Sequence, residues 1–250
     1  MSVSFIKVLA PMAGITNADF CLKLIPCGFD MVTLGGYNAD KPTIHAGKKI
    51  MERGRLEFDI SEGELIDKIK KEADKIKENW NGELSVNIRS LTPDPIIEIS
   101  KLKKVDVVEI NAHCRQKEIT SIGCGQALLS NPDFMEEFVL HVVKKAKSKV
   151  SVKIRAHVPG VDELKIVNII ENTGADFIHV DAMKPGYKEA DLDLITRIKD
   201  RCSIFIIGNN SITDLDSAQK MIDSGAQGIS IARAAMAGKL NFDLSKIRLS

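Results

Sequence analysis

The chain alternates short apolar runs with amphipathic or polar stretches along its whole length. Eight runs rich in Val and Ile have the length of a strand, and helical patterns follow most of them. Near-continuous apolar strands are typical of a parallel sheet that is covered on both faces. Eight strand–helix units favour an α/β fold of the closed (β/α)8 TIM barrel type over an open doubly wound sheet. The predicted strands span residues 5–10, 29–34, 84–88, 105–110, 150–154, 175–180, 203–207 and 228–232.

Local signals place the helices between these strands. Asn131 and Pro132 suit the N-cap and the first position of a helix, whereas Gly174 and Gly225 suit left-handed caps at helix ends. After the Gly35-Gly36 turn, residues 37–61 are expected to form a long polar loop that can cover a substrate. Helices are predicted at residues 17–25, 65–80, 94–102, from 131 onward, 162–172, 190–200, 212–224 and 233–237.

Composition narrows the class of protein. The 250 residues are 44% apolar and contain no linker or compositional break, so we expect one domain over 1–250. A formal charge of +1 gives no overall electrostatic footprint for nucleic acid or membranes. No leader sequence or membrane-spanning apolar run is visible, which predicts a soluble, cytoplasmic protein. The five cysteines match neither a disulfide framework nor a metal motif, and no metal is expected.

Polar side chains recur where the predicted strands end. The fourth strand leads into Asn111, His113 and Cys114, and the fifth ends on Lys153. Loops at the carboxyl ends of barrel strands build the active site, so these side chains are expected to share one pocket. A thiol in such a pocket is a nucleophile or a general acid, although a packed, inert cysteine is the alternative interpretation. Cys124, between two glycines, is the rival thiol.

Lys153 and His179 interrupt otherwise apolar strands. A lysine that points into the mouth of a barrel needs an anionic partner, such as a phosphate or a reduced flavin. A surface lysine and a hydrogen-bonded core histidine are the alternative interpretations.

A phosphate site is predicted after the seventh and eighth strands, where barrels often bind phosphate. Gly208 and Asn209 precede one predicted helix, and Ala232 and Arg233 precede another. After the first strand, the compact Ala10-Pro11-Met12 segment either lets a flat ligand approach the backbone or forms a tight turn.

Together these segments resemble the tRNA-dihydrouridine synthases, a family of flavin enzymes with a (β/α)8 barrel. The matching segments occur in the family's order and cover nearly the whole chain: Leu9-Ala-Pro-Met-Ala-Gly-Ile-Thr16, Val108-Glu-Ile-Asn-Ala-His-Cys114, Gly125-Gln-Ala-Leu-Leu129, Val152-Lys-Ile-Arg155, His179, Gly208-Asn209 and Ile231-Ala-Arg233.

The resemblance implies an oxidoreductase with bound FMN. Its general acid would be Cys114, which protonates the carbon next to the one that receives hydride. The electron donor would be a nicotinamide cofactor. Asn87 stands at the place of a Gln that meets the flavin ring in the family. The residues that the resemblance implies as cofactor contacts are Ala10, Pro11, Met12, Asn87, Asn111, Lys153, His179, Gly208, Asn209, Ala232 and Arg233.

The sequence also departs from the family pattern. His113 and Arg115 replace the Gly and Pro that flank the family's cysteine, and Asp181 replaces an Arg. Only 17 residues follow Arg233, where the family carries a helical tRNA-binding domain. The substrate is therefore expected to be either tRNA or a small molecule, as in dihydroorotate-dehydrogenase-like barrels. A non-catalytic barrel that binds a phosphorylated ligand is the third hypothesis.

Overall fold

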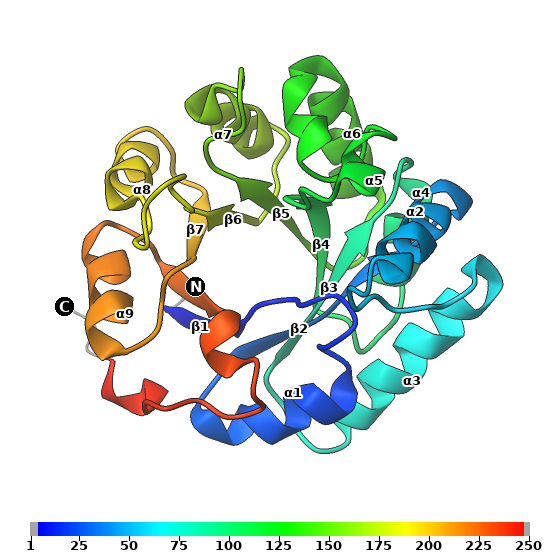
Figure 1. Ribbon diagram of the computed structural model, residues 1–250, viewed down its shortest axis with the longest axis horizontal. Coiled ribbons are helices and arrows are strands. Elements are labelled where there is room, and N and C mark those ends of the chain that lie inside the picture. The colour runs from blue at the N-terminus through cyan, green and yellow to red at the C-terminus, as the bar shows by residue number, and fades with distance from the viewer. Residues whose placement is uncertain (1–4, 248–250) are drawn as a thin grey trace.

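Eight parallel strands close into a barrel in which each strand pairs with the next and β8 pairs with β1 (Figure 1). The computed structural model describes residues 5–247. The prediction of a closed (β/α)8 barrel with eight strands is confirmed. The strands are β1 (Ile6–Leu9), β2 (Met31–Asn38), β3 (Glu83–Arg89), β4 (Val107–Ala112), β5 (Lys149–Arg155), β6 (Phe177–Asp181), β7 (Phe205–Asn209) and β8 (Gly228–Ile231).

Helices surround the strands on the outside of the barrel (Figure 1). Asn17, Asn131 and Asp162 cap three of the helices by accepting hydrogen bonds from backbone N–H groups of the first turn. Gly174 and Gly225 have positive φ, as predicted. The helices that match predicted ones are α1 (Ala18–Leu24), α3 (Leu65–Lys77), α4 (Asp94–Ser100), α6 (Pro132–Lys145), α7 (Glu163–Asn172), α8 (Leu192–Lys199) and α9 (Leu215–Asp223).

Short helical segments fill several connections. The last predicted helix, 233–237, is reduced to a three-residue 3-10 turn, η4 (Arg233–Ala235). The others are η1 (Ile25–Cys27), η2 (Glu62–Glu64), α5 (Lys117–Thr120), η3 (Gly125–Ser130) and η5 (Leu244–Lys246).

The prediction of a loop over residues 37–61 was wrong for residues 37–38 and 41–52 and holds for residues 53–61. Gly35 and Gly36 do not end a strand, because β2 continues through them to Asn38 with a shift in register. Helix α2 (Lys41–Glu52) follows, and its start is fixed by a capping box between Asp40 and Thr43. Gly47, within this helix, interrupts the amphipathic pattern by which a helix is recognised. Glycine is required at this position because an added Cβ would clash with Nδ2 of Asn38.

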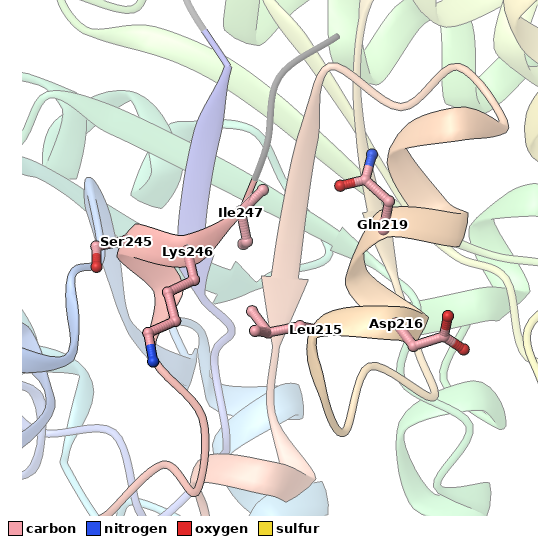
Figure 2. Close-up of a pocket in the computed structure, with 6 residues that line it drawn as sticks. All are labelled: Leu215, Asp216, Gln219, Ser245, Lys246 and Ile247. Atoms are coloured by element: carbon pink, nitrogen blue, oxygen red, sulfur yellow. The ribbon is translucent and has the colours of Figure 1, made fainter.

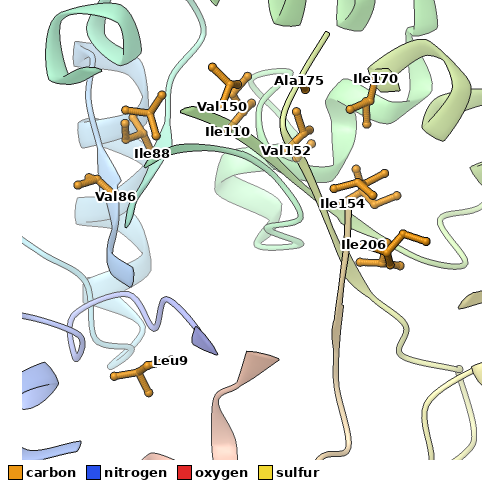
Figure 3. Packing of buried hydrophobic residues seen from close by; sticks show 14 of the residues in the cluster. Leu9, Val86, Ile88, Ile110, Val150, Val152, Ile154, Ile170, Ala175 and Ile206 are labelled. Atoms are coloured by element: carbon orange, nitrogen blue, oxygen red, sulfur yellow. The ribbon is translucent and has the colours of Figure 1, made fainter. Parts of the chain in front are cut away.

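The alternating side chains of the strands form two apolar layers. Outward-facing residues pack under the helices, among them Val86, Ile88, Ile110, Val152, Ile154 and Ile206 (Figure 3). A smaller cluster includes Val8, Met31, Val107, Phe177 and Phe205. Phe177 and Phe205 meet edge to face with ring centroids 5.4 Å apart. These residues precede the polar positions of their strands, so the apolar cluster lies beneath the polar residues of the barrel interior.

Within residues 5–247, no helix combines the length and apolar character needed to cross a bilayer. In the same range, His, Cys, Asp and Glu side chains nowhere gather in threes that could bind a metal ion. The five cysteines are all free thiols.

We expect Ile206→Ala to lower the free energy of unfolding by about 2–5 kcal/mol, because it removes apolar atoms from a fully buried site and leaves a cavity. Urea unfolding followed by circular dichroism measures the change. Met236→Ala is the matched control, since Met236 is 49% exposed and its truncation should change the value by less than about 0.5 kcal/mol. Equal losses for the two variants would contradict this account of the core.

Candidate active site

A buried carboxylate, Glu109, joins side chains of four strands inside the barrel. One of its oxygens accepts a hydrogen bond from Asn87 Nδ2 at 2.7 Å. The other lies 3.0 Å from Ser151 Oγ and 2.8 Å from His179 Nδ1. Because β5 separates β4 from β6, contact between Glu109 and His179 requires both side chains to point into the barrel. These four residues form the inner layer of the site.

Burial and charge set the protonation of this layer. Burial alone would raise the pKa of Glu109, but His179 and Lys153 outweigh it and lower the pKa to about 2. Burial and the charge of Lys153 lower the pKa of His179 to about 4. The imidazole is therefore neutral near pH 7, with the Nδ1 proton donated to Glu109. Its Nε2 atom is then an acceptor, and within the described chain this buried atom has no hydrogen-bond partner.

Lys153 supplies a buried positive charge beside this layer. Its side chain is 2% exposed, and no group in residues 5–247 forms a hydrogen bond or ion pair with its ammonium. Burial lowers the pKa of Lys153, although Glu109 and Asp181 oppose that shift. Register pairs Lys153 with Asn111 on one side and His179 on the other, so three predicted site residues lie next to one another.

Asn111 fixes the loop that carries the predicted catalytic thiol. Its Oδ1 atom accepts hydrogen bonds from the backbone N–H groups of His113 and Cys114, at 3.2 and 2.9 Å. Its Nδ2 atom donates to Asn87 Oδ1 at 2.8 Å. The two amides lie against Gly36, where an added Cβ would be 2.7 Å from Asn87 Oδ1. The polar inner layer and the cysteine loop are therefore mechanically linked.

The two candidate thiols have different surroundings. Cys114 is half-buried at the mouth, whereas Cys124 is fully buried. Burial raises the pKa of Cys124 to about 12, and its Sγ lies 3.6 Å from the carbonyl oxygen of Ser90. Gly125 packs against the cysteine loop, because an added Cβ would lie 2.4 Å from the Cys114 carbonyl oxygen. Only Cys114 of the two is positioned to meet a ligand.

A second carboxylate, Asp181, organises the rim. Its Oδ2 atom lies 2.6 Å from His113 Nε2 and 2.9 Å from Arg155 Nη1, and its Oδ1 accepts a 2.6 Å hydrogen bond from Asn210. Arg233 in turn donates to Asn210 Oδ1 at 3.1 Å. Burial would raise the pKa of Asp181, but these partners lower it well below its usual range. His113 and Asp181, two departures from the family pattern, thus contact each other directly.

The predicted phosphate residues occupy the β7 and β8 ends of the same rim. Asn209 donates from Nδ2 to the Ser230 carbonyl oxygen at 2.8 Å, and Arg233 is exposed. Gly208 faces α9, since an added Cβ would lie 2.4 Å from Met221 Sδ. Helix α9 begins later than predicted, and the Asp214 carboxylate already accepts from its first turn.

The β1 loop completes the circle of strand ends. The Ala10 N–H donates to the Ile231 carbonyl oxygen at 2.9 Å, and the Met12 N–H donates to Thr16 Oγ1 at the same distance. Ala10 and Met12 are buried and Pro11 is half-buried. Ala232, also half-buried, follows β8 directly. The structure therefore brings the predicted residues to one end of the barrel.

A surface pocket elsewhere holds none of these residues. It lies between α9 and the C-terminal segment and is lined by Leu215, Asp216, Gln219, Ser245, Lys246 and Ile247 (Figure 2). Another surface pocket lies between α2 and residues 59–64. The candidate active site is formed instead by the side chains at the carboxyl ends of the strands.

Comparison with known proteins identifies the family. The family model described as dihydrouridine synthase matches residues 8–239, most of the chain. The chain belongs to the dihydrouridine synthase family. A relative from Methanocaldococcus jannaschii, described as an uncharacterized protein, is 37% identical and covers 94% of this chain and 91% of its own.

Named synthases are more distant relatives of this family member. A tRNA-dihydrouridine synthase B from Proteus vulgaris is 28% identical over 91% of this chain and 67% of its own length. One from Pasteurella multocida is 29% identical over 61% of this chain, which spans only 48% of that protein.

Solved structures support the fold alone. FabK from Thermotoga maritima aligns with a TM-score of 0.57 at 15% identity, over 92% of this chain and 58% of that one. A tryptophan synthase complex structure from Pyrococcus furiosus aligns with a TM-score of 0.61 at 14% identity, over 94% of this chain and 88% of the other.

The sequence reasoning missed three charged residues of the site. Glu109 and Arg89 lie on strands, and Glu57 follows α2. Arg89 is fully buried and forms an ion pair with Glu57, beside Cys114. Arg89 and Glu109 could have been found from the alternation of polar and apolar residues along their strands, because polar residues at every second position of an apolar strand point into the barrel. Glu57 carries no such signal, because its partner is distant in sequence.

The pKa shifts of the inner layer predict acid sensitivity. Between about pH 6.5 and 4, unfolded His179 binds a proton that the folded, neutral imidazole does not, so stability should fall as the pH drops. Glu109 should add a loss below about pH 4.5, where the unfolded chain takes up its proton first. We expect His179→Gln to flatten the upper part of this profile in urea unfolding at several pH values.

His141→Gln, at an exposed position of α6, is the matched control and should leave the slope unchanged. An unaltered slope in His179→Gln would show that the histidine is not held neutral by its surroundings.

Proposed function

We propose that this family member is an FMN-dependent oxidoreductase that reduces the C=C bond of a uracil-type base, with tRNA as the substrate. The single observation that carries the proposal is the Lys153 side chain at the strand ends, which is 2% exposed and forms no hydrogen bond or ion pair within the described chain. A buried cation is costly without an anion, so the site is built for an anionic guest. Family membership supports dihydrouridine synthesis as the chemistry.

The donor set fits a flavin. Lys153 supplies a cation for the electron-rich edge of the ring, and the free Nε2 of His179 offers a buried acceptor. The Asn87 and Asn111 amides pack directly against Gly36, where an added Cβ would lie 2.7 Å from Asn87 Oδ1. Pro11 and Met12 would border the ring from the β1 loop, together with Ala10. The phosphate would be held by the strand-end residues Gly208, Asn209, Ala232 and Arg233.

Different residues of the chain then have different roles in the reaction. The chemistry that FMN would supply, after reduction by a nicotinamide cofactor, is hydride for one carbon of the pyrimidine C=C bond. Cys114 donates the proton to the neighbouring carbon, since its half-buried thiol lies at the mouth, where a base can reach it. Asn111 holds the backbone of that thiol through two accepted hydrogen bonds. Arg155, fixed by Asp181, presents a further cation toward the substrate space.

A free small molecule is the second candidate substrate. The near-neutral charge of the chain gives little overall attraction for a polyanion, which favours this alternative. Mass spectrometry of unmodified tRNA after incubation with the protein and a nicotinamide donor should reveal dihydrouridine. If free uracil or dihydropyrimidines turn over and tRNA does not, the substrate half of the proposal fails while the flavin half stands.

We expect the purified protein to carry FMN, visible in its absorption spectrum, and Lys153→Met to weaken FMN binding about tenfold or more, equivalent to about 1.4 kcal/mol. The reason is loss of the cation beside the flavin edge. Lys149→Met removes a lysine from the opposite end of the same strand, where it pairs with Glu83, and should retain the flavin. A colourless protein that does not take up added FMN would refute the cofactor.

We expect Cys114→Ala to keep its flavin and its reduction by the nicotinamide donor, yet to lose dihydrouridine formation by about 10²–10⁴-fold. Cys27→Ala is the matched control, because this half-buried thiol in η1 lies outside the strand-end site. Product formation at the normal rate in Cys114→Ala would exclude the thiol as the acid.

A further inference from the structure

We infer that Arg89 and Glu57 form a charge pair that positions the Cys114 sulfur, with the Arg89 N–H directed at the atom that carries the negative charge when the thiol gives up its proton. Arg89 lies at the end of β3, and its Nη1 atom lies 3.7 Å from Cys114 Sγ, within reach of a hydrogen bond to sulfur. Resting on the proposed role of Cys114 as the acid, the inference adds a positioning residue and its counter-ion.

The pair is buried and geometrically fixed. The side chains of Arg89 and Glu57 are 2% and 4% exposed. Arg89 Nη1 donates to Glu57 Oε1 at 3.1 Å, while Nη2 contacts Oε2 and also donates to the Gly36 carbonyl oxygen at 3.0 Å. A two-pronged contact of this kind holds a guanidinium plane in one orientation. Arg89 Nη1 is thereby aimed at the sulfur.

The segment before η2 delivers Glu57 to this place. Gly14 allows its approach, since an added Cβ would lie 2.7 Å from both the Glu57 nitrogen and Leu56 Cβ. Asn38, at the end of β2, lies 3.5 Å from the second carboxylate oxygen. Residues 53–60, part of the segment 37–61 that was predicted to cover a substrate, thus contribute a charged side chain to the wall of the site.

The thiol is also held by its backbone and by apolar packing. Asn111 accepts from the Cys114 N–H, and the Gln126 N–H donates to the Cys114 carbonyl oxygen at 3.0 Å. The side chain packs against the cluster of Ala46, Ile50, Ile119 and Cys124, and Arg89 is the charged group that donates to the sulfur.

Charge gives the contact a chemical role. When the S–H bond breaks and its proton forms a C–H bond with the substrate carbon, the electron pair stays on sulfur as a thiolate. An arginine N–H beside the sulfur stabilises that anion, whereas the Glu57 carboxylate opposes it. Solvent returns the proton after product leaves.

Other groups also face this sulfur. Arg155 of β5 acts on it electrostatically, and Cys124 lies across the loop. On its own loop, His113 is committed to Asp181, and Arg115 is near Arg155. Arg89 differs from all of them in direct contact with the sulfur, and Glu57 is the carboxylate bound to that contact.

The test is the rate at which iodoacetamide alkylates Cys114 at fixed pH, followed peptide by peptide with mass spectrometry on the full-length protein. The thiolate is the reacting form. We expect Glu57→Gln to speed alkylation by about tenfold, because Arg89 is freed of its counter-ion. We expect the double variant Arg89→Gln with Glu57→Gln to slow alkylation by about tenfold relative to the wild type. Arg89→Lys keeps a positive charge at this position, so its rate should lie between those of the double variant and the wild type.

The opposite signs, measured where urea unfolding shows both variants to be as folded as the wild type, separate this role from a structural one. The double variant removes both charges together, so no unpaired buried charge is left to unfold it. Arg53→Gln, which removes an exposed arginine paired with Glu118, is the control and should stay within about twofold of the wild type. An unchanged or slower rate in Glu57→Gln overturns the inference. The assay measures alkylation of the thiol and neither flavin reduction nor tRNA turnover, so its failure is distinct from failure of the proposed function.

Discussion

The inner part of the site depends on the hydrogen bonds that the ionised Glu109 carboxylate accepts. It accepts from Asn87, Ser151 and His179, so its two oxygens join β3, β5 and β6 to its own strand. Its burial in the barrel is stable because donors surround the charge. Protonation of Glu109 would weaken those hydrogen bonds. The carboxyl group would then no longer favour the neutral tautomer of His179 that carries its proton on Nδ1. A strand-crossing carboxylate is therefore what fixes the proton positions of the site.

A second constraint operates at the rim. Asp181 gathers His113, Arg155 and Asn210, while Arg233 is joined through the asparagine. His113 and Asp181 meet in one hydrogen bond, so a carboxylate at the end of β6 holds the histidine of the cysteine loop. The rim of this barrel is thus organised around an anion.

The sequence was sufficient for the architecture because strand periodicity and capping residues act locally. Asn131, Asp162 and the eight apolar strands could be recognised from a few neighbouring residues. Strand polarity also placed Cys114, Lys153 and His179 together, since parallel strands end on the same side. Helix α2 was missed because Gly47, required by contact with Asn38, disrupts the helical pattern. Glu57 was missed because its role exists only through a partner 32 residues away.

Three carboxylates and several cations share this end of the barrel, and their pairing shows what the site lacks. Glu57 is bound to Arg89, Asp181 to Arg155 and His113, and Glu109 to neutral donors. Lys153 feels the fields of Glu109 and Asp181, yet no carboxylate in the described chain contacts it. The positive charge of Lys153 therefore faces a space in which the carboxylates already have partners, and the unpaired Nε2 of His179 lies on the adjacent strand. The proposed flavin, with its electron-rich edge, would suit both groups.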